Sequence, residues 1–169
     1  MVTTYHFILA NTPGLRKLPF EQMQAEGLDR AVLWHKAAPS IFDWLDCVNP
    51  AHAICALGYD GDTLAGALWL NPVMGLCGCV HFCIFKAARD EWENLGRQAI
   101  AWIFDSYPLA ALAAIYPASY RHVTKAARAW GFDMASQRLP MACHMPTTDN
   151  PRRCRDAQIA VLRRETFER

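Results

Sequence analysis

Two different periodicities of apolar residues follow one another in the middle of the chain. Val80 to Phe85 is a short apolar run rich in β-branched and aromatic residues, which predicts a buried strand. From Trp92 to Phe104 the apolar residues recur at helical spacing, which predicts an amphipathic helix. The segment between the two is polar. We therefore expect a strand, a loop and a helix in succession.

The polar loop, Lys86 to Glu91, is the first candidate binding element. The start of a helix presents backbone N–H groups without partners and the positive end of the helix dipole. Nucleotide phosphates commonly bind at such a place. An ordinary strand–helix connection is the alternative, and the loop residues do not decide between the two.

The first part of the chain predicts one strand followed by helices. Val2 to Leu9 is the expected strand, and Asn11 to Gly14 reads as a turn that closes it. Phe20 to Lys36 has helical character, with Gly27 as a residue that would divide it. Ser40 is a suitable N-cap for a second short helix.

A hairpin is expected next. Ala51 to Tyr59 and Thr63 to Leu70 read as strands, and the Asp60-Gly61 pair between them is typical of a tight hairpin turn. A further turn leads into the Val80 strand. Three antiparallel strands in sequence are therefore predicted.

The last part predicts two more strands, a helix and a tail. Leu109 to Ile115 reads as a strand, the helix from Pro117 ends near Gly131, and Arg138 to Met145 reads as a final strand. A helix between the Val80 and Leu109 strands allows these two to run parallel. The basic segment after the linker at 147–151 is predicted to be helical.

The predicted fold class is therefore α/β (α+β), a mixed and mostly antiparallel sheet of about six strands with helices on both faces. We expect one domain over residues 1–146 and a basic, helical C-terminal tail over 147–169. The tail arginines suit a solvated face. An arm that binds a partner or joins two copies in a homodimer is the alternative.

Composition narrows the class of protein. The chain has 169 residues, 53% of them apolar and 20% charged, as in an ordinary soluble domain. A formal net charge of +1 argues against nucleic acid as the main ligand. Seven scattered cysteines and no charged-then-apolar leader favour reduced thiols in a cytoplasmic protein. No apolar run is long enough for a membrane span.

One family resemblance emerges from the second half of the chain. Residues 114–132 read AIYPASYRHVTKAARAWGF. This is similar to a strand, an Asn-x-x-Ala/Ser sequence and a helix ending in Gly-Phe in the GNAT N-acetyltransferase superfamily. With the order of elements and the strand–loop–helix at Val80–Phe104, the chain resembles a divergent member of that superfamily with a degenerate acyl-CoA loop.

The resemblance implies a cofactor site. In the family, the fourth and fifth strands part, and the pantetheine arm of acetyl-CoA pairs with the backbone of strand four, here Val80–Phe85. The pyrophosphate then lies at the start of the next helix. The residues that would bind acetyl-CoA here are Cys83, Ile84, Phe85, Lys86, Arg89, Asn94, Leu95, Gly96 and Arg97.

The chain departs from the family pattern at several positions. The family loop reads Arg/Gln-x-x-Gly-x-Gly/Ala. With Gly96 as its second glycine, Asn94 stands at the first glycine and Glu91 at the Arg/Gln. Ala127 stands where the family often has a tyrosine that protonates the thiolate, and alanine cannot donate a proton. These departures favour an alternative in which the protein has lost its chemistry and acts by binding a partner.

Two residues are the catalytic candidates. His81 near the start of strand four would accept the amine proton near neutral pH, in the place from which family members often draw a general base. Tyr120, at the start of the helix after strand five, is our candidate general acid. The structural alternatives are a hydrogen-bonded histidine within the fold and an aromatic residue that caps the helix.

Two further groups of residues are candidates for a role in the site. Cys79, His81 and Cys83 alternate and share one sheet face, but the outer two lie about 13 Å apart along a strand, too far to bind one metal ion. No metal site is therefore predicted. Trp34, His35 and Trp44 would line an aromatic acceptor pocket, or pack in the core.

Taken together, the sequence predicts an acyl-CoA-dependent N-acyltransferase, with acetyl-CoA as co-substrate. It would transfer the acyl group to a primary amine of a small molecule or a protein by direct attack in a ternary complex. The alternative is a catalytically inactive GNAT-fold binding protein of the kind associated with phages or mobile elements. A thiol-based redox protein is disfavoured because the sequence contains no Cys-x-x-Cys.

Overall fold

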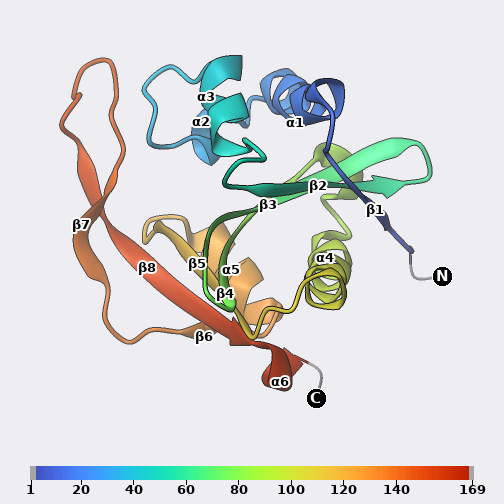
Figure 1. The fold of residues 1–169 in the computed structure, drawn as a ribbon. Helices are drawn as coiled ribbons and strands as arrows, with labels where there is room; N and C mark the ends of the chain where they lie inside the picture. The colour runs from blue at the N-terminus through green and yellow to red at the C-terminus, as the bar shows by residue number, and fades with distance from the viewer. Residues whose placement is uncertain (1–2, 168–169) are drawn as a thin grey trace.

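The computed structural model of the protein describes residues 3–167 (Figure 1). Within this range the chain forms one mixed sheet of eight strands. The elements are β1 (His6–Leu9), α1 (Pro13–Glu26), α2 (Asp29–Val32), α3 (Ile41–Cys47), β2 (Ile54–Asp60), β3 (Thr63–Met74), β4 (Cys77–Ile84), a 3₁₀ turn (Lys86–Ala88), α4 (Trp92–Ser106), β5 (Ala111–Pro117), α5 (Arg121–Ala129), β6 (Asp133–Met134), β7 (Leu139–His144), β8 (Cys154–Arg163) and α6 (Arg164–Phe167).

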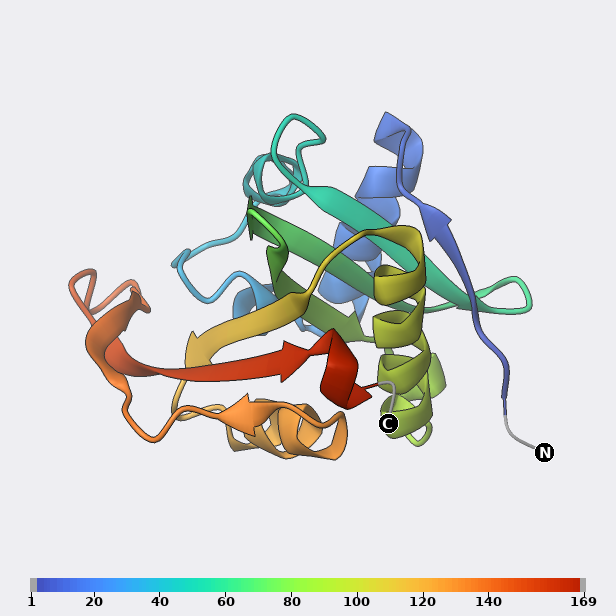
Figure 2. The ribbon, with the colours of Figure 1, turned by 60° about the horizontal axis from the view of Figure 1, so that its bottom comes forward.

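Helices cover both faces of the sheet. α1, α2 and α3 lie on one face of the N-terminal strands, and α4 and α5 lie on the other face (Figures 1 and 2). The first face buries Phe20, Met23 and Trp44 against the sheet. The second buries Ile100 and Ile103 of α4. This confirms the predicted fold class, although the number of strands is larger than expected.

The helix signals in the first part of the chain were partly misread. Asn11 to Gly14 is not a turn that closes a strand, because the Thr12 side chain accepts a hydrogen bond from the Leu15 N–H and caps α1. Pro13 then takes the first helical position, where its missing N–H costs nothing. Gly27 ends this helix in a left-handed conformation (φ 67°), as its predicted role as a divider requires.

The predicted hairpin is present. β2 and β3 are antiparallel, and Asp60 pairs with Thr63 across the turn at Gly61 (φ 55°). β3 and β4 are also antiparallel, so the predicted three-stranded succession is correct. Within it, Trp69 of β3 stands directly opposite His81 of β4.

β4 and β5 are neighbours for only part of their length. Residues 77–79 of β4 pair in parallel with residues 111–113 of β5, and the two strands form no pair beyond Cys79 and Ala113. β4 nevertheless continues to Ile84 and β5 to Pro117. The two strands therefore part, as the family resemblance implied, and leave a gap in the middle of the sheet.

The prediction of a helical C-terminal tail is wrong for most of that segment. Cys154–Arg163 forms β8, which pairs with β5 from Ala111↔Arg163 to Pro117↔Ala157 and carries β6 and β7 on its other edge. Ala160 and Leu162 are buried in the main core. The apolar run within β8 is too short to show a clear period, so its spacing also fits a helix. The segment 147–169 is accordingly no separate tail over its described part.

Within residues 3–167, no helix has the length and apolar character needed to cross a membrane.

The role of β8 can be tested by Leu162→Ala. Leu162 is 1% exposed, and removal of its side chain should lower the free energy of unfolding by about 2–5 kcal/mol. The control is Glu165→Ala, since Glu165 is exposed and its pair with Arg163 is at the surface, so a change of less than about 1 kcal/mol is expected. Urea unfolding measures both. Equal stabilities would show that β8 contributes nothing to the core.

Candidate functional site

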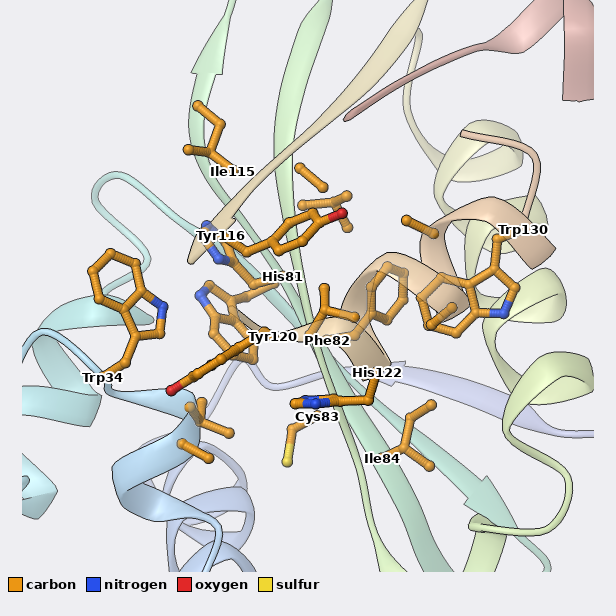
Figure 3. A pocket seen from close by; sticks show the side chains of 18 of the residues that line it. Trp34, His81, Phe82, Cys83, Ile84, Ile115, Tyr116, Tyr120, His122 and Trp130 are labelled. Atoms are coloured by element: carbon orange, nitrogen blue, oxygen red, sulfur yellow. The ribbon is translucent and has the colours of Figure 1, made fainter. Parts of the chain in front are cut away.

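A cavity of about 280 Å³ lies where β4 and β5 part (Figure 3). Its walls come from β4 and β5, from α5, and from the region of α2 and Trp34. Because successive side chains of a strand point to opposite faces, the cavity has two halves. His81 and Cys83 face the α1–α3 side, and Phe82 and Ile84 face the α4–α5 side.

His81 is held in one orientation by two neighbours. Its Nε2 lies 3.0 Å from the Asn71 carbonyl oxygen, and its ring stacks on Trp69 at 5.1 Å with an interplanar angle of 9°. A carbonyl only accepts, so Nε2 carries the hydrogen and Nδ1 is the acceptor atom of the neutral ring. Burial lowers the pKa of His81, against the opposing effect of the Asn71 bond. The neutral imidazole is therefore the form present at pH 7.

Tyr120 occupies the N-cap position of α5 and also lines the cavity. Its ring stacks on His122 at 5.4 Å. Burial raises the pKa of Tyr120, with Arg153 acting in the opposite direction. The phenol therefore keeps its proton at neutral pH, which is the state that a proton donor needs. Tyr116 lines the cavity too, but its hydroxyl donates to Thr124 Oγ1 at 3.2 Å.

The predicted cofactor-binding residues of β4 fall on two sides. Cys83 and Ile84 line the cavity, whereas Phe85 is fully buried in the core under α1 and α3. Burial raises the pKa of the Cys83 thiol to about 12, and the Glu26 carboxylate adds to this. Cys83 is thus a protonated part of the wall rather than a nucleophile.

Lys86 and Arg89 are engaged by Glu26, which the sequence did not single out. The Lys86 backbone N–H donates to Glu26 Oε2 at 2.8 Å, and Arg89 Nη2 lies 3.7 Å from the same oxygen. Gln22 also donates to this carboxylate at 2.8 Å. The Glu26 carboxylate therefore caps the 3₁₀ turn after β4 and takes up its first backbone N–H group.

The remaining loop side chains also have partners within the protein. Asn94 donates to the Thr3 carbonyl at 2.8 Å, Leu95 packs under Tyr5, and Arg97 donates to the Ala129 carbonyl at 2.6 Å. None of residues 86–97 lines the cavity. An anion at the start of α4 would therefore rely on the backbone N–H groups of the first helical turn, which lack intrahelical partners.

Trp130 separates the cavity from the start of α4. Its indole lines the cavity on one side, and on the other a Cβ atom added to Gly96 would lie 2.0 Å from the ring. Phe82 and Trp92 pack against the same indole at 5.0 and 6.1 Å. Among residues 3–167, the Trp130 Nε1–H is buried and has no hydrogen-bond acceptor. A buried donor of this kind calls for a partner.

The residues fit the pantetheine part of an acyl-CoA. Beyond Cys79 and Ala113, the backbone groups on the facing edges of β4 and β5 do not pair with each other, so they can bond to the amide groups of pantetheine. The cavity extends as far as Trp130 and does not reach the loop at 86–97. The pyrophosphate contacts of that loop therefore remain a prediction.

Of the three residues predicted for an aromatic acceptor pocket, only Trp34 lines the cavity. His35 packs edge-on against Trp34 at 5.7 Å, and Trp44 is fully buried with its Nε1 donating to the Arg16 carbonyl at 2.7 Å. Trp69, which the sequence analysis did not single out, also lines the cavity. The hairpin register, which pairs it with His81, was the signal that could have identified it.

No three His, Cys, Asp or Glu side chains among residues 3–167 cluster as metal ligands do.

Comparison with solved structures identifies the fold. The chain superimposes on spermidine N-acetyltransferase from Vibrio cholerae, in complex with CoA and spermine, with a TM-score of 0.76 at 10% identity, covering 98% of both chains. It is similar to a probable GNAT-family acetyltransferase from Chromobacterium violaceum (0.76, 13% identity, 98% of this chain and 90% of that one). It is also similar to a ribosomal-protein-S5-alanine acetyltransferase from Vibrio fischeri (0.69, 12% identity, 96% and 94%).

No protein-family model and no curated protein sequence matches the chain. The likeness is thus one of structure, and the fold is that of the GNAT N-acetyltransferases.

The contact between Gly96 and Trp130 can be tested by Gly96→Ala. The new methyl group would overlap the indole, so we expect a loss of about 1–3 kcal/mol in the free energy of unfolding and a shift in tryptophan emission. Gly14→Ala is the control. It is also helical, a Cβ there meets nothing within 4 Å, and alanine favours the helix. Equal stabilities of the two variants would contradict the close contact.

Proposed function

We propose that this chain, with its GNAT fold, is an acyl-CoA-dependent N-acyltransferase that uses acetyl-CoA and a primary amine. The observation that supports this most is the parting of β4 and β5 around a cavity that a neutral histidine and a protonated tyrosine line. Bound acetyl-CoA would supply an activated acetyl group in the form of its thioester. The protein then needs to position the amine and to move two protons.

His81 is the proposed general base. As the amine nitrogen forms a bond to the thioester carbonyl carbon, His81 Nδ1 accepts a proton from that nitrogen. The Nε2 bond to Asn71 and the stacked Trp69 ring fix the direction of Nδ1. When the carbon–sulfur bond breaks, the proton of the Tyr120 hydroxyl passes to the departing sulfur. The products are an amide and free CoA thiol. The His81 imidazolium then gives up its proton to solvent and the Tyr120 phenolate takes one from solvent, so atoms and charges balance and both side chains return to their starting states.

In this proposal Tyr120 takes the role of the tyrosine that the family often has at the position of Ala127. Both residues line the cavity from α5, but Tyr120 does so from the N-terminal end of the helix. The binding residues in the proposal are those of the cavity wall, Cys83 and Ile84, with the backbone at the start of α4. Lys86, Arg89, Asn94, Leu95, Gly96 and Arg97 support that backbone through contacts within the protein.

The proposal predicts that the protein binds acetyl-CoA. A ligand that binds only the folded protein at 100 times its dissociation constant adds about 2.7 kcal/mol to stability, so the melting temperature should rise with acetyl-CoA. Ala114→Phe, which places a ring in the gap between the strands, should abolish this rise. Ala113→Phe is the control, because Ala113 pairs with Cys79 where the two strands are still bonded and is not part of the cavity wall.

Absence of any rise for the unmodified protein at millimolar acetyl-CoA would reject the transferase proposal. The inactive binding protein would then be the better account of the fold.

The role of His81 predicts a pH dependence. Since burial lowers the pKa of His81 below its usual 6.5, kcat at saturating amine should stay level from pH 8 down to about 6.5 and fall below it as the ring gains a proton. His81→Gln keeps a donor for the Asn71 carbonyl but cannot accept the proton, so kcat should drop by about 10²–10⁴-fold. His52→Gln, at another histidine bonded to a carbonyl, is the matched control. An unchanged kcat in His81→Gln would exclude His81 as the base.

A further inference from the structure

We propose that the acceptor of this site is a small primary amine carried by a flat, uncharged group, in chemical terms an arylalkylamine, and that polyamines are disfavoured. This inference rests on the proposed transferase function. It concerns the half of the cavity on the α1–α3 side, where His81 lies, which we assign as the acceptor half. It is carried by the kinds of side chain that line the wall and by the charges around it.

The side chains that line the cavity are mostly apolar or aromatic. Among the described residues, the lining includes no Asp, Glu, Lys or Arg, and His81 is neutral. An ammonium group transferred from water into such a wall would lose its hydration without gaining a counter-ion, which is costly. A single reacting amine avoids this cost by giving up its proton, and an apolar site favours that loss. A polyamine would meet the same cost again for each further ammonium that enters the cavity.

The carboxylate that acts on Cys83 of the cavity wall is not available as a counter-ion. Glu26 lies behind Cys83, where its charge raises the pKa of the thiol, and its side chain is 9% exposed. It accepts hydrogen bonds from the Lys86 N–H and from Gln22, and it pairs with Arg89. Its charge is therefore already compensated within the protein.

The α5 wall of the cavity is positively charged. Helix α5, which forms one wall, carries Arg121, Lys125 and Arg128 and no acidic residue. Arg153 acts on Tyr120 from the β7–β8 side. These charges repel a polycation as it approaches. The spermidine acetyltransferase fold is thus present without the charge pattern that a polyamine would require.

Aromatic side chains gather in the acceptor half. Trp34, His81 and Tyr120 lie around the same part of the cavity in Figure 3, and Trp69 stacks beneath His81. Flat aromatic ligands pack well against such rings. Each pair of aromatic rings in an offset or edge-on contact, with centroids roughly 4.5–7 Å apart, contributes about 0.5–1.5 kcal/mol. The cavity is also small, just under the roughly 300–1,000 Å³ of common ligand pockets. A compact aromatic amine meets both conditions.

The test compares acceptors on the full chain. With acetyl-CoA present, release of CoA thiol is measured with 2-phenylethylamine, with spermidine and with a short peptide that has a free N-terminus. We expect kcat/KM for 2-phenylethylamine to exceed that for the other two by about 10²-fold or more, because unpaired buried charge is strongly rejected. A higher kcat/KM for spermidine or for the peptide would overturn the inference while the transferase function stands.

A binding measurement separates the two proposals. Calorimetry of 2-phenylethylamine without acetyl-CoA should give saturable binding that Trp34→Ala weakens by about tenfold. The acetyl-CoA melting shift should be unchanged in that variant. Phe42→Ala is the control, since Phe42 is 79% exposed on α3 and lies outside the cavity.

Amine binding with no acetyl-CoA shift would reject the transferase function but support the ligand class. An acetyl-CoA shift with no amine binding would reject the ligand class alone. Absence of both would reject both proposals.

Discussion

The structure depends on an unequal pairing of β5. On one edge β5 is bonded to β8 along its whole length, from Ala111 to Pro117, and on the other it meets β4 only up to Ala113. The edge of β5 that faces β4 can stay open because β5 keeps a full set of backbone partners on the edge that faces β8. Without β8, the outer half of β5 would have no strand beside it. The last strand of the chain thus maintains a gap to which it contributes no lining residue.

The regular elements were largely predictable because their signals are local. The Asp60-Gly61 turn, the Ser40 cap with its reciprocal bond to Asp43, and the helical spacing after Trp92 each act within a few residues. The errors arose where a local signal has two meanings. Thr12-Pro13 can close a turn or open a helix, and the apolar run within Cys154–Arg163 fits a strand as well as a helix. Only its pairing with β5 decides the second case.

The site was predictable only in part, for a different reason. His81, Cys83 and Tyr120 reach the cavity because strand alternation and a helix start fix where they point. The loop side chains do not, since their partners come from distant parts of the sequence. Glu26 reaches the turn after β4 from α1, and Thr3 takes the Asn94 side chain from the N-terminal segment. The spacing of residues along the sequence does not predict contacts between such distant positions.

The fit of the Trp130 ring on Gly96 also bears on how this sequence can diversify. The two positions share one volume, so a side chain can be added at one only if the other gives up atoms. Random variation at residue 96 alone would return almost only glycine, whereas joint variation of both positions would recover larger residues beside smaller partners. In a collection of relatives, these two columns of the alignment should therefore change together, and their joint state would reveal in which lineages the passage between α4 and the cavity is open.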